Sequence, residues 1–303
     1  MAVSCYQKKE KLQMLVKRKL VRKYSPAGQA GFLGEGHIAR AVVQGDFTDT
    51  DPFILLMDDM LDKKTDEPVG GPHPHAGFET VSLLLEGEMG DETHKMKGGD
   101  LQMMTAGSGI IHTETITGKI RMRLLQLWLT LPEKDRWISP RVQDIALNRV
   151  QATSVNGVGI KLYSGSLAGI SSPLQNHTPV IIADIRMQPD TSTIFNLPAS
   201  YSSFLYVIDG AVLVGDEQEL LDHDEVGWLN RLEDRDESEL TLSAGVSGTR
   251  FVLYSGQPQG VKIVSHGPFI GDTSDDITRL YREFRGGKMQ HVSALTGSRR
   301  ISW

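Results

Sequence analysis

Two short segments of this chain carry side chains that could bind a metal ion. The first contains His73 and His75, and the second contains His112 and Glu114. Each pair is separated by one residue, and residues i and i+2 of an extended strand point to the same face, about 7 Å apart. Two such pairs on facing strands could therefore converge on one ion, with three imidazoles and one carboxylate as ligands.

The donor types limit the choice of metal. Imidazole is a good ligand for Zn, Cu, Fe and Ni, and the absence of a thiolate from the set disfavours a closed structural zinc site. On an octahedral ion these four groups leave one or two positions open for substrate or dioxygen, an arrangement similar to the facial triad of non-haem iron oxygenases. The set favours Fe(II), with Mn, Ni, Cu and Zn as alternatives.

Two neighbouring residues could also contribute. Glu79 has the same parity as the two histidines of the first segment, so an unbroken strand would place it on their face. It could be a ligand, a partner of a ligand or an ordinary strand residue. His94 precedes the second segment in a Lys-rich stretch. It could line the mouth of the site, although a solvated loop histidine is the simpler interpretation.

The segments that must position these residues have the pattern of short strands. Apolar runs bounded by Gly, Pro and Asp predict strands, and the polar stretches that include Asp58, Asp59 and residues 63–67 predict a loop. No long helix interrupts this pattern, which is typical of a β-sandwich or barrel. The predicted strands are 38–43, 53–57, 79–86, 101–104, 120–131, 158–163, 180–187, 204–208, 211–214, 226–229, 240–242 and 251–254.

A weak internal repeat suggests two copies of one domain. Residues 80–87 and 203–210 both read as an apolar strand that ends in an acidic residue and Gly, and a period of this length exceeds that of a solenoid. The second copy lacks a His-x-His pair. Near the end of the sequence, Ile277, Leu280, Tyr281 and Phe284 follow the spacing of an amphipathic helix before Gly286.

Composition and charge exclude several classes of protein. Of 303 residues, 39% are hydrophobic and 23% are charged, which is typical of a globular chain. A net charge of −6 does not suggest direct nucleic-acid binding. The single cysteine, Cys5, supports no disulfide framework, and no apolar run is long enough for a signal peptide core or a membrane span. We therefore expect a cytoplasmic protein.

The motifs together resemble the pirin family of the cupin superfamily. The resemblance rests on Asp51-Pro52-Phe53, residues 73–81, residues 99–114, residues 125–128 and His266-Gly267-Pro268-Phe269, in this order. It implies an all-β fold of two cupin barrels, a bicupin, with a short C-terminal helix. The expected division is a metal-binding barrel in residues 1–135, and in residues 136–303 a barrel without a metal site, followed by the helix and tail.

The resemblance also implies a ligand set and two functions. It assigns the metal to His73, His75, His112 and Glu114, and makes Glu79 a non-ligand. The first hypothesis is a dioxygenase that cleaves a flavonol such as quercetin, in which Glu114 accepts the substrate proton. Its partners would be an aromatic small molecule and dioxygen. The alternative is a non-catalytic, redox-sensitive iron protein that regulates protein partners.

Overall fold

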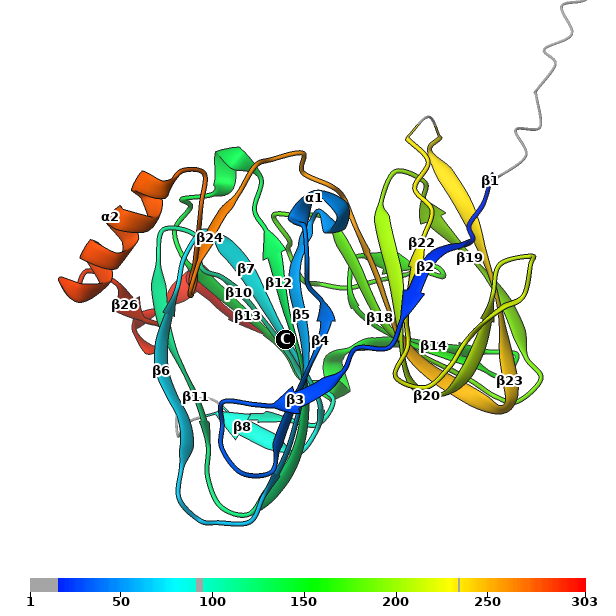
Figure 1. Ribbon diagram of the computed structural model, residues 1–303, viewed down its shortest axis with the longest axis horizontal. Helices are drawn as coiled ribbons and strands as arrows, with labels where there is room; N and C mark the ends of the chain where they lie inside the picture. Colours follow the sequence, from blue (N-terminus) through cyan, green and yellow to red (C-terminus); the bar gives the residue numbers. More distant parts are fainter. Residues whose placement is uncertain (1–15, 91–94, 234) are drawn as a thin grey trace, which may run out of the picture.

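The computed structural model describes residues 16–90, 95–233 and 235–303, and their strands form two β-barrels that lie side by side (Figure 1). The predicted all-β fold of two barrels is confirmed. In the described part of the chain the α-helices are α1 (Phe47–Thr50) and α2 (Ser274–Arg285). None of the described helices is long and apolar enough to cross a membrane.

The first barrel is built from a large sheet and a small one. The large sheet has the order β27-β13-β10-β7-β12-β5-β4-β3, and the small sheet has the order β26-β11-β6. The short pair β8 and β9 lies beside them. Their bounds are β3 (Gly28–Ala30), β4 (His37–Val43), β5 (Phe53–Lys63), β6 (Val69–His75), β7 (Phe78–Glu86), β8 (Glu88–Gly90), β9 (Lys95–Lys97), β10 (Leu101–Thr105), β11 (Ile110–Ile116), β12 (Ile120–Thr130), β13 (Arg141–Ile145), β26 (Gln290–His291) and β27 (Arg300–Ser302).

The second barrel has one sheet whose main path is β14-β15-β18-β23-β20-β22-β2, with β1 and β19 on β23 and β21 on β20. A separate pair, β16 and β17, flanks it, and the β24–β25 hairpin follows. The bounds are β1 (Val16–Lys17), β2 (Leu20–Tyr24), β14 (Gln151–Val155), β15 (Val158–Ser164), β16 (Ser166–Leu167), β17 (Ile170–Ser171), β18 (Val180–Met187), β19 (Ser192–Pro198), β20 (Ser202–Val214), β21 (Glu219–Leu221), β22 (Val226–Leu229), β23 (Glu237–Gly256), β24 (Val264–His266) and β25 (Phe269–Gly271).

Several predicted boundaries differ from the observed ones. The segments 204–208 and 211–214 belong to one strand, β20, because bulges next to Gly210 bend the strand without ending it. The segments 240–242 and 251–254 likewise both lie in β23. The predicted loop at Asp58 and Asp59 is wrong, since β5 continues to Lys63. Both carboxylates are buried there.

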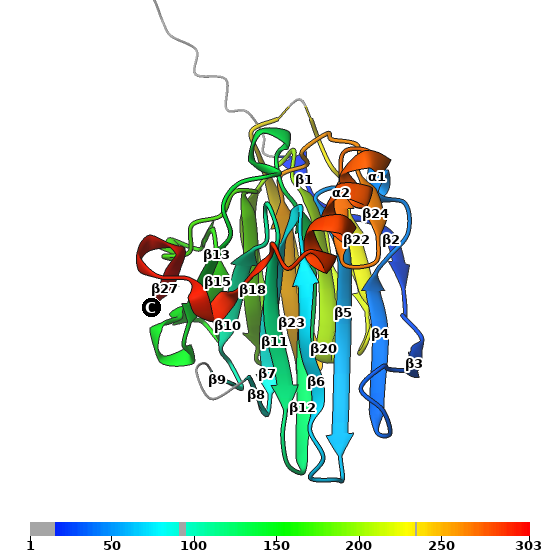
Figure 2. The same ribbon diagram turned by 90° about the vertical axis from the view of Figure 1, so that its left-hand side faces the viewer.

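The two barrels pack against each other through their large sheets, whose strands run in similar directions in Figure 2. Phe53 of β5 lies in the apolar cluster between them, with its ring centroid 5.0 Å from that of Phe204 and 6.4 Å from that of Tyr254. Edge-to-face contacts of this kind add to the stabilisation from burial.

Strands from each half of the chain complete the other half's barrel. β1 and β2 pair with strands of the second barrel, while β13, β26 and β27 pair with strands of the first. The division at residues 135 and 136 stays a prediction, and these exchanged strands tie its two sides together.

Helix α2 forms where the apolar spacing predicts it. Thr273 and Asp276 form a capping box at its start, and Gly286 lies at its end. Its buried residues, Ile277 and Leu280, pack in one cluster with Phe269 of β25 and Ala76, which follows β6. The helix therefore holds the β24–β25 hairpin against the first barrel.

Candidate metal centre

The two segments with metal-ligand spacing are neighbouring strands in the structure. β6 and β11 pair antiparallel, with His73 opposite His112 and Gly71 opposite Glu114. His75 lies two residues beyond His73 on β6, so strand alternation gives these side chains a common face. The sheet register thus brings together two segments that are separated by more than 30 residues in the sequence.

The three histidines form a compact cluster. Their candidate ligand nitrogens all lie within 4.8 Å of one another, and Nε2 of His73 is 2.7 Å from Nε2 of His112. The ring centroid of His75 is 4.9 Å from that of each of the other two. No other group of three or more potential ligands with this geometry occurs in the described ranges.

A backbone contact sets the tautomer of His73. Its Nδ1 lies 2.9 Å from the carbonyl oxygen of Gly71, which can only accept, so Nδ1 carries the proton. The lone pair is then on Nε2, the atom that faces His112. Metal-bound histidines use this arrangement, in which a hydrogen bond to one ring nitrogen orients the other toward the ion.

Burial keeps the other two imidazoles neutral. His75 and His112 are 5% and 4% exposed. Burial and the neighbouring His73 lower the pKa of His75 to about 3. Burial, followed by the neighbouring histidines, also lowers the pKa of His112 well below its ordinary value. Since only the neutral ring binds metal, both side chains are ready to do so near neutral pH.

Glu114 stands beside the cluster. One of its carboxylate oxygens, Oε2, lies 3.9 Å from Nε2 of His73. Burial raises the pKa of this carboxyl, while His73 acts in the opposite direction. The structure gathers the three histidines closely and places Glu114 next to one of them, so the assignment of all four as ligands stays a prediction. The donor set, with imidazole nitrogens and one carboxylate, fits a divalent first-row metal.

The other two candidates lie elsewhere. Glu79 does not continue the face of β6, because the chain bends at Gly77 between β6 and β7. Its Oε1 accepts a hydrogen bond of 2.7 Å from Thr105, and the charges acting on it come from His177 and Arg141. Burial raises the pKa of Glu79. His94 lies outside the described residues.

The glycine in the first segment is required by a close approach. Gly77 has a φ of +85°, and a Cβ there would lie 1.9 Å from the carbonyl oxygen of Ile270. The neighbouring backbone nitrogen of Ile270 donates to the carbonyl oxygen of Ala76 at 3.0 Å. The strand β25, which begins in the sequence motif at residues 266–269, therefore supports the end of β6 that carries His75.

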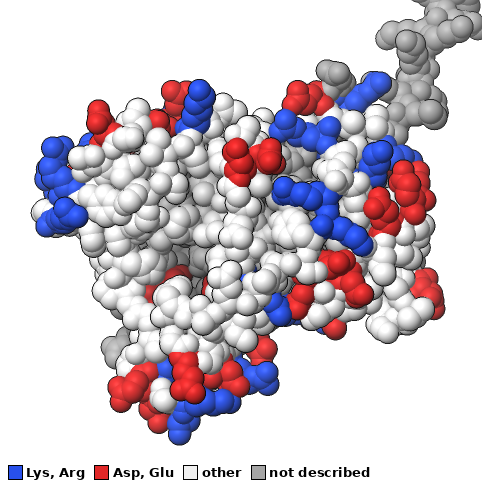
Figure 3. All heavy atoms as spheres, viewed as in Figure 1, with Lys and Arg blue, Asp and Glu red and all other residues white. Residues whose placement is uncertain are grey.

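A cavity of about 530 Å³ opens beside the cluster. Strand alternation builds its walls: Leu55, Met57 and Asp59 come from β5, and Met122, Leu124, Gln126 and Trp128 come from β12. His73, His75 and Glu114 lie in the opposite wall. Figure 3 shows the hollow bordered by uncharged residues, with acidic atoms inside it.

The sequence reasoning missed most of these wall residues. The signal that could have found them is the alternation of Leu55, Met57 and Asp59, which continues the face of the apolar run through the acidic pair. No Lys or Arg lines this cavity in the described part of the chain.

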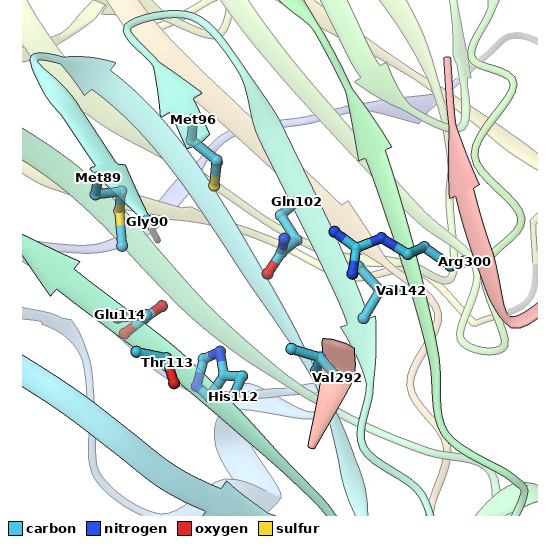
Figure 4. Close-up of a pocket in the computed structure, with 10 residues that line it drawn as sticks. All are labelled: Met89, Gly90, Met96, Gln102, His112, Thr113, Glu114, Val142, Val292 and Arg300. Carbon is cyan, nitrogen blue, oxygen red and sulfur yellow. The ribbon is translucent and has the colours of Figure 1, made fainter. Parts of the chain in front are cut away.

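A second, much smaller cavity of about 40 Å³ adjoins the first, with which it shares Met89 and Glu114. Figure 4 shows His112, Thr113 and Glu114 at one side of it and Gln102, Val142 and Arg300 at another. The tail after α2 encloses this side, since β26 pairs with β11 and Nε2 of His291 lies 2.9 Å from Oγ1 of Thr113. The tail thus contributes Val292 and Arg300 to the lining of a cavity that His112 and Glu114 also line.

Family models match most of both barrels. The model described as Pirin matches residues 36–129, and the model described as Pirin C-terminal cupin domain matches residues 182–290. Pirin of Homo sapiens is 33% identical over 273 residues, which cover 87% of this chain and 91% of the human protein.

Solved structures have the same fold. A quercetin 2,3-dioxygenase from Acinetobacter baumannii superimposes with a TM-score of 0.79 at 24% identity, and covers 90% of this chain and 98% of its own. The bacterial pirin YhhW from Escherichia coli, solved in complex with nickel(II), has a TM-score of 0.58 at 19% identity, with coverage of 78% and 99%. The histidine cluster of this chain suggests a metal cofactor.

Proposed function

The chain belongs to the pirin family, and we propose that it is a metal-dependent dioxygenase that cleaves a flavonol-like hydroxy-carbonyl compound. The observation that carries the proposal is a cluster of three histidines, two of which, His73 and His75, line a largely apolar cavity of about 530 Å³. A cavity of this size is typical of small-molecule sites. The fold shared with a quercetin 2,3-dioxygenase supports this choice of reaction.

The proposed ligands are His73, His75, His112 and Glu114, with Fe(II) as the proposed metal. A bound Fe(II) ion would act as a Lewis acid toward the substrate and provide a position for dioxygen. The protein's contribution is to keep His75 and His112 neutral through burial, which lowers the pKa of each, and to orient His73 through its contact with the Gly71 carbonyl.

The side chains of the cavity would bind and orient the substrate. Leu55, Met57 and Leu124 offer apolar surface to a planar ring system and exclude water from it. Trp128 adds an aromatic surface close to the cluster, with its ring centroid 5.4 Å from that of His75. Glu114 lines the same cavity, so its carboxylate could accept the proton of the substrate hydroxyl.

The overall reaction needs no external reductant. Both atoms of dioxygen would enter the product as the ring opens to an ester, and one ring carbon would leave as carbon monoxide. The described lining contains no Lys or Arg, which favours a neutral substrate over a carboxylate. The negative charge of a substrate carboxylate would face Asp59 and Glu114 with no cationic side chain to compensate it.

The test is oxygen consumption with quercetin under Fe(II) loading, with the metal content measured on the same samples. We expect turnover in the wild type and the loss of both turnover and bound metal in His75→Ala. His223→Ala is the matched control, since its side chain is exposed on the second barrel. Its metal content and rate should equal those of the wild type.

Stoichiometric metal without turnover in the wild type would reject the dioxygenase and keep the metal site. That result would favour the alternative, an iron protein that regulates protein partners from the cytoplasm. Partner binding that follows the oxidation state of the iron would then be the next measurement.

A further inference from the structure

We propose that Asp59 is a specificity-determining residue of the cavity, held in place by His37 so that it accepts a hydrogen bond from a substrate hydroxyl that does not bind the metal. This inference rests on the proposed function, because it assumes that the cavity takes a hydroxylated aromatic compound. It explains why a carboxylate occurs in a wall that is otherwise largely apolar.

A chain of two hydrogen bonds fixes the Asp59 carboxylate. The backbone N–H of Leu33 donates to Nδ1 of His37 at 3.1 Å, so the proton of the neutral ring is on Nε2. Nε2 then donates to Oδ1 of Asp59 at 3.0 Å. The His37 side chain is fully buried, and this contact uses only part of the acceptor capacity of the carboxylate.

The remaining acceptor capacity of Asp59 faces the cavity. Asp59 follows Leu55 and Met57 on the face of β5 that lines the cavity, and it is 9% exposed. Glu114 lines the same cavity as Asp59. β5 belongs to the large sheet and β11 to the small one, so the two carboxylates lie in different walls.

The same histidine positions the lip of the cavity. Gly31, Phe32 and Leu33 lie in the turn between β3 and β4, and a Cβ on Gly31 would lie 2.0 Å from Nδ1 of His37. The Phe32 ring makes an edge contact with His37 at 5.6 Å between centroids, yet the residue is 87% exposed. Phe32 and Leu33 line the cavity, so His37 orders both the lip and the acceptor.

A hydrogen-bond donor lies near this acceptor. Oγ of Ser82 donates to Oε1 of Gln126 at 2.9 Å, which leaves the amide group of Gln126 available as a donor. On the paired strands Asp59 is opposite Leu124, and Gln126 is two residues further along β12. Such diagonal neighbours are about 7–8 Å apart. An acceptor and a donor at this spacing can distinguish polyhydroxylated compounds from those that only chelate.

The test compares two ligands that share the chelating end. Quercetin and 3-hydroxyflavone both carry the 3-hydroxyl and 4-carbonyl groups, and 3-hydroxyflavone lacks every other hydroxyl. Binding is measured without oxygen on metal-loaded protein by absorbance titration, so no turnover is involved. A hydrogen bond to a buried charged group predicts that the wild type prefers quercetin by about tenfold or more.

Asp59→Asn should remove this preference while 3-hydroxyflavone binds as before, because the amide oxygen accepts from Nε2 of His37 and the NH₂ group, a donor, replaces the carboxylate oxygen that faces the cavity. Asp62→Asn is the matched control. It makes the same change on the same strand, at an exposed side chain paired with Lys64. The ratio of the two dissociation constants in Asp62→Asn should remain that of the wild type.

Each other outcome overturns the inference. Equal weakening of both ligands by Asp59→Asn would show a structural role only, and a wild type without preference would exclude recognition by Asp59. If Asp59→Asn does not fold, His37→Leu/Asp59→Leu removes both partners without leaving an unpaired charge, and the same ratio is measured. If the wild type binds quercetin and 3-hydroxyflavone equally well, the proposed function stands and only the inference about Asp59 fails. If it binds neither compound, both the proposed function and the inference fail.

Discussion

Leu205 on β20 and Leu253 on β23 lie opposite each other in the second barrel and are fully buried among apolar neighbours. In the first barrel, Met57 on β5 and Leu124 on β12 instead face an open cavity. In the second barrel the apolar cluster of Leu205 and Leu253 draws on strands all around it. The first barrel leaves part of its interior open, and the wall across the cavity, β6 and β11, carries the histidine cluster.

The filled interior of the second barrel should matter most for stability, and the open interior of the first should matter most for binding. Side chains packed on all sides contribute the full free energy of burial, while those that line a cavity lose part of those contacts. We therefore expect variants of the second barrel to change stability most and variants of the first barrel to change metal and ligand binding most.

The largest expected effect is on metal binding. His112→Ala removes one of the three clustered imidazoles, and it should weaken metal binding by more than about 100-fold, since even the loss of a residue that only hydrogen-bonds a ligand costs 10- to 100-fold. Metal content after dialysis measures this. His177→Ala, outside the cluster, is the control, and an equal loss of metal there would contradict the assignment to β6 and β11.

The next effect concerns the contact between the barrels. Asp58 is fully buried and accepts hydrogen bonds from Arg123 at 3.0 and 2.7 Å and from Tyr206 of the second barrel at 2.7 Å. Asp58→Ala leaves Arg123 without its main partner and should lower the free energy of unfolding by about 3–5 kcal/mol. Urea denaturation measures this change.

Asp62→Ala, on the same strand, should change the stability by less than about 1 kcal/mol, because its pair with Lys64 is exposed. Equal stability of Asp58→Ala and the wild type would mean that the barrels are held together by their apolar cluster alone.

A core truncation tests the filled interior directly. Leu205→Ala should lower the free energy of unfolding by about 2–5 kcal/mol, because it leaves a void in a packed core. Leu124→Ala should cost clearly less, since that side chain already borders a cavity. Denaturation curves of the two variants measure the free energy of unfolding, and an equal decrease in both would contradict the proposed difference between the two interiors.

The smallest effect is a pH dependence. The buried carboxylate Asp184 of the second barrel is hydrogen-bonded by Arg250 at 3.0 and 2.8 Å, whereas Glu79 of the first accepts from the neutral hydroxyl of Thr105. Burial raises the pKa of Glu79 above its ordinary value of 4.5, so the folded state keeps this proton longer than the unfolded state.

Stability should therefore fall as the pH rises above 4.5 and through the raised pKa of Glu79, by about 1.4 kcal/mol for each unit of pKa difference. Glu79→Gln cannot ionise and should flatten this part of the curve. Thermal unfolding between pH 4 and 8 measures the difference, and parallel curves for the two proteins would show that Glu79 does not contribute.

The sequence predicted the two barrels from its strand pattern and its family resemblance, and it predicted the histidine cluster from the spacing of the ligands and the expected pairing of their two strands. Strand alternation placed His73 and His75 on one face, and the pairing of β6 with β11 brought in His112. The sequence left the role of Glu79 open. Its odd number places it on the face of His73 and His75 only if the strand is unbroken, and the chain bends at Gly77 between them.

Asp59 could not be assigned correctly because its role depends on distant contacts. An acidic pair after an apolar run predicts a loop, but His37 and Arg123 from neighbouring strands provide partners that keep both carboxylates within β5. The exchange of β26 and β27 into the first barrel has no local signal either, as the tail after Gly287 shows no clear pattern.

The pairing of the late strand β26 with β11 affects the order in which the parts of the first barrel are synthesised. β26 pairs with β11, the strand that carries His112 and Glu114, yet the ribosome reaches β26 only after it has translated the whole of the second barrel. A nascent chain that contains β6 and β11 still lacks the tail residues Val292 and Arg300, which line the small cavity beside His112 and Glu114. The surroundings of the histidine cluster are therefore complete only after both barrels have been translated.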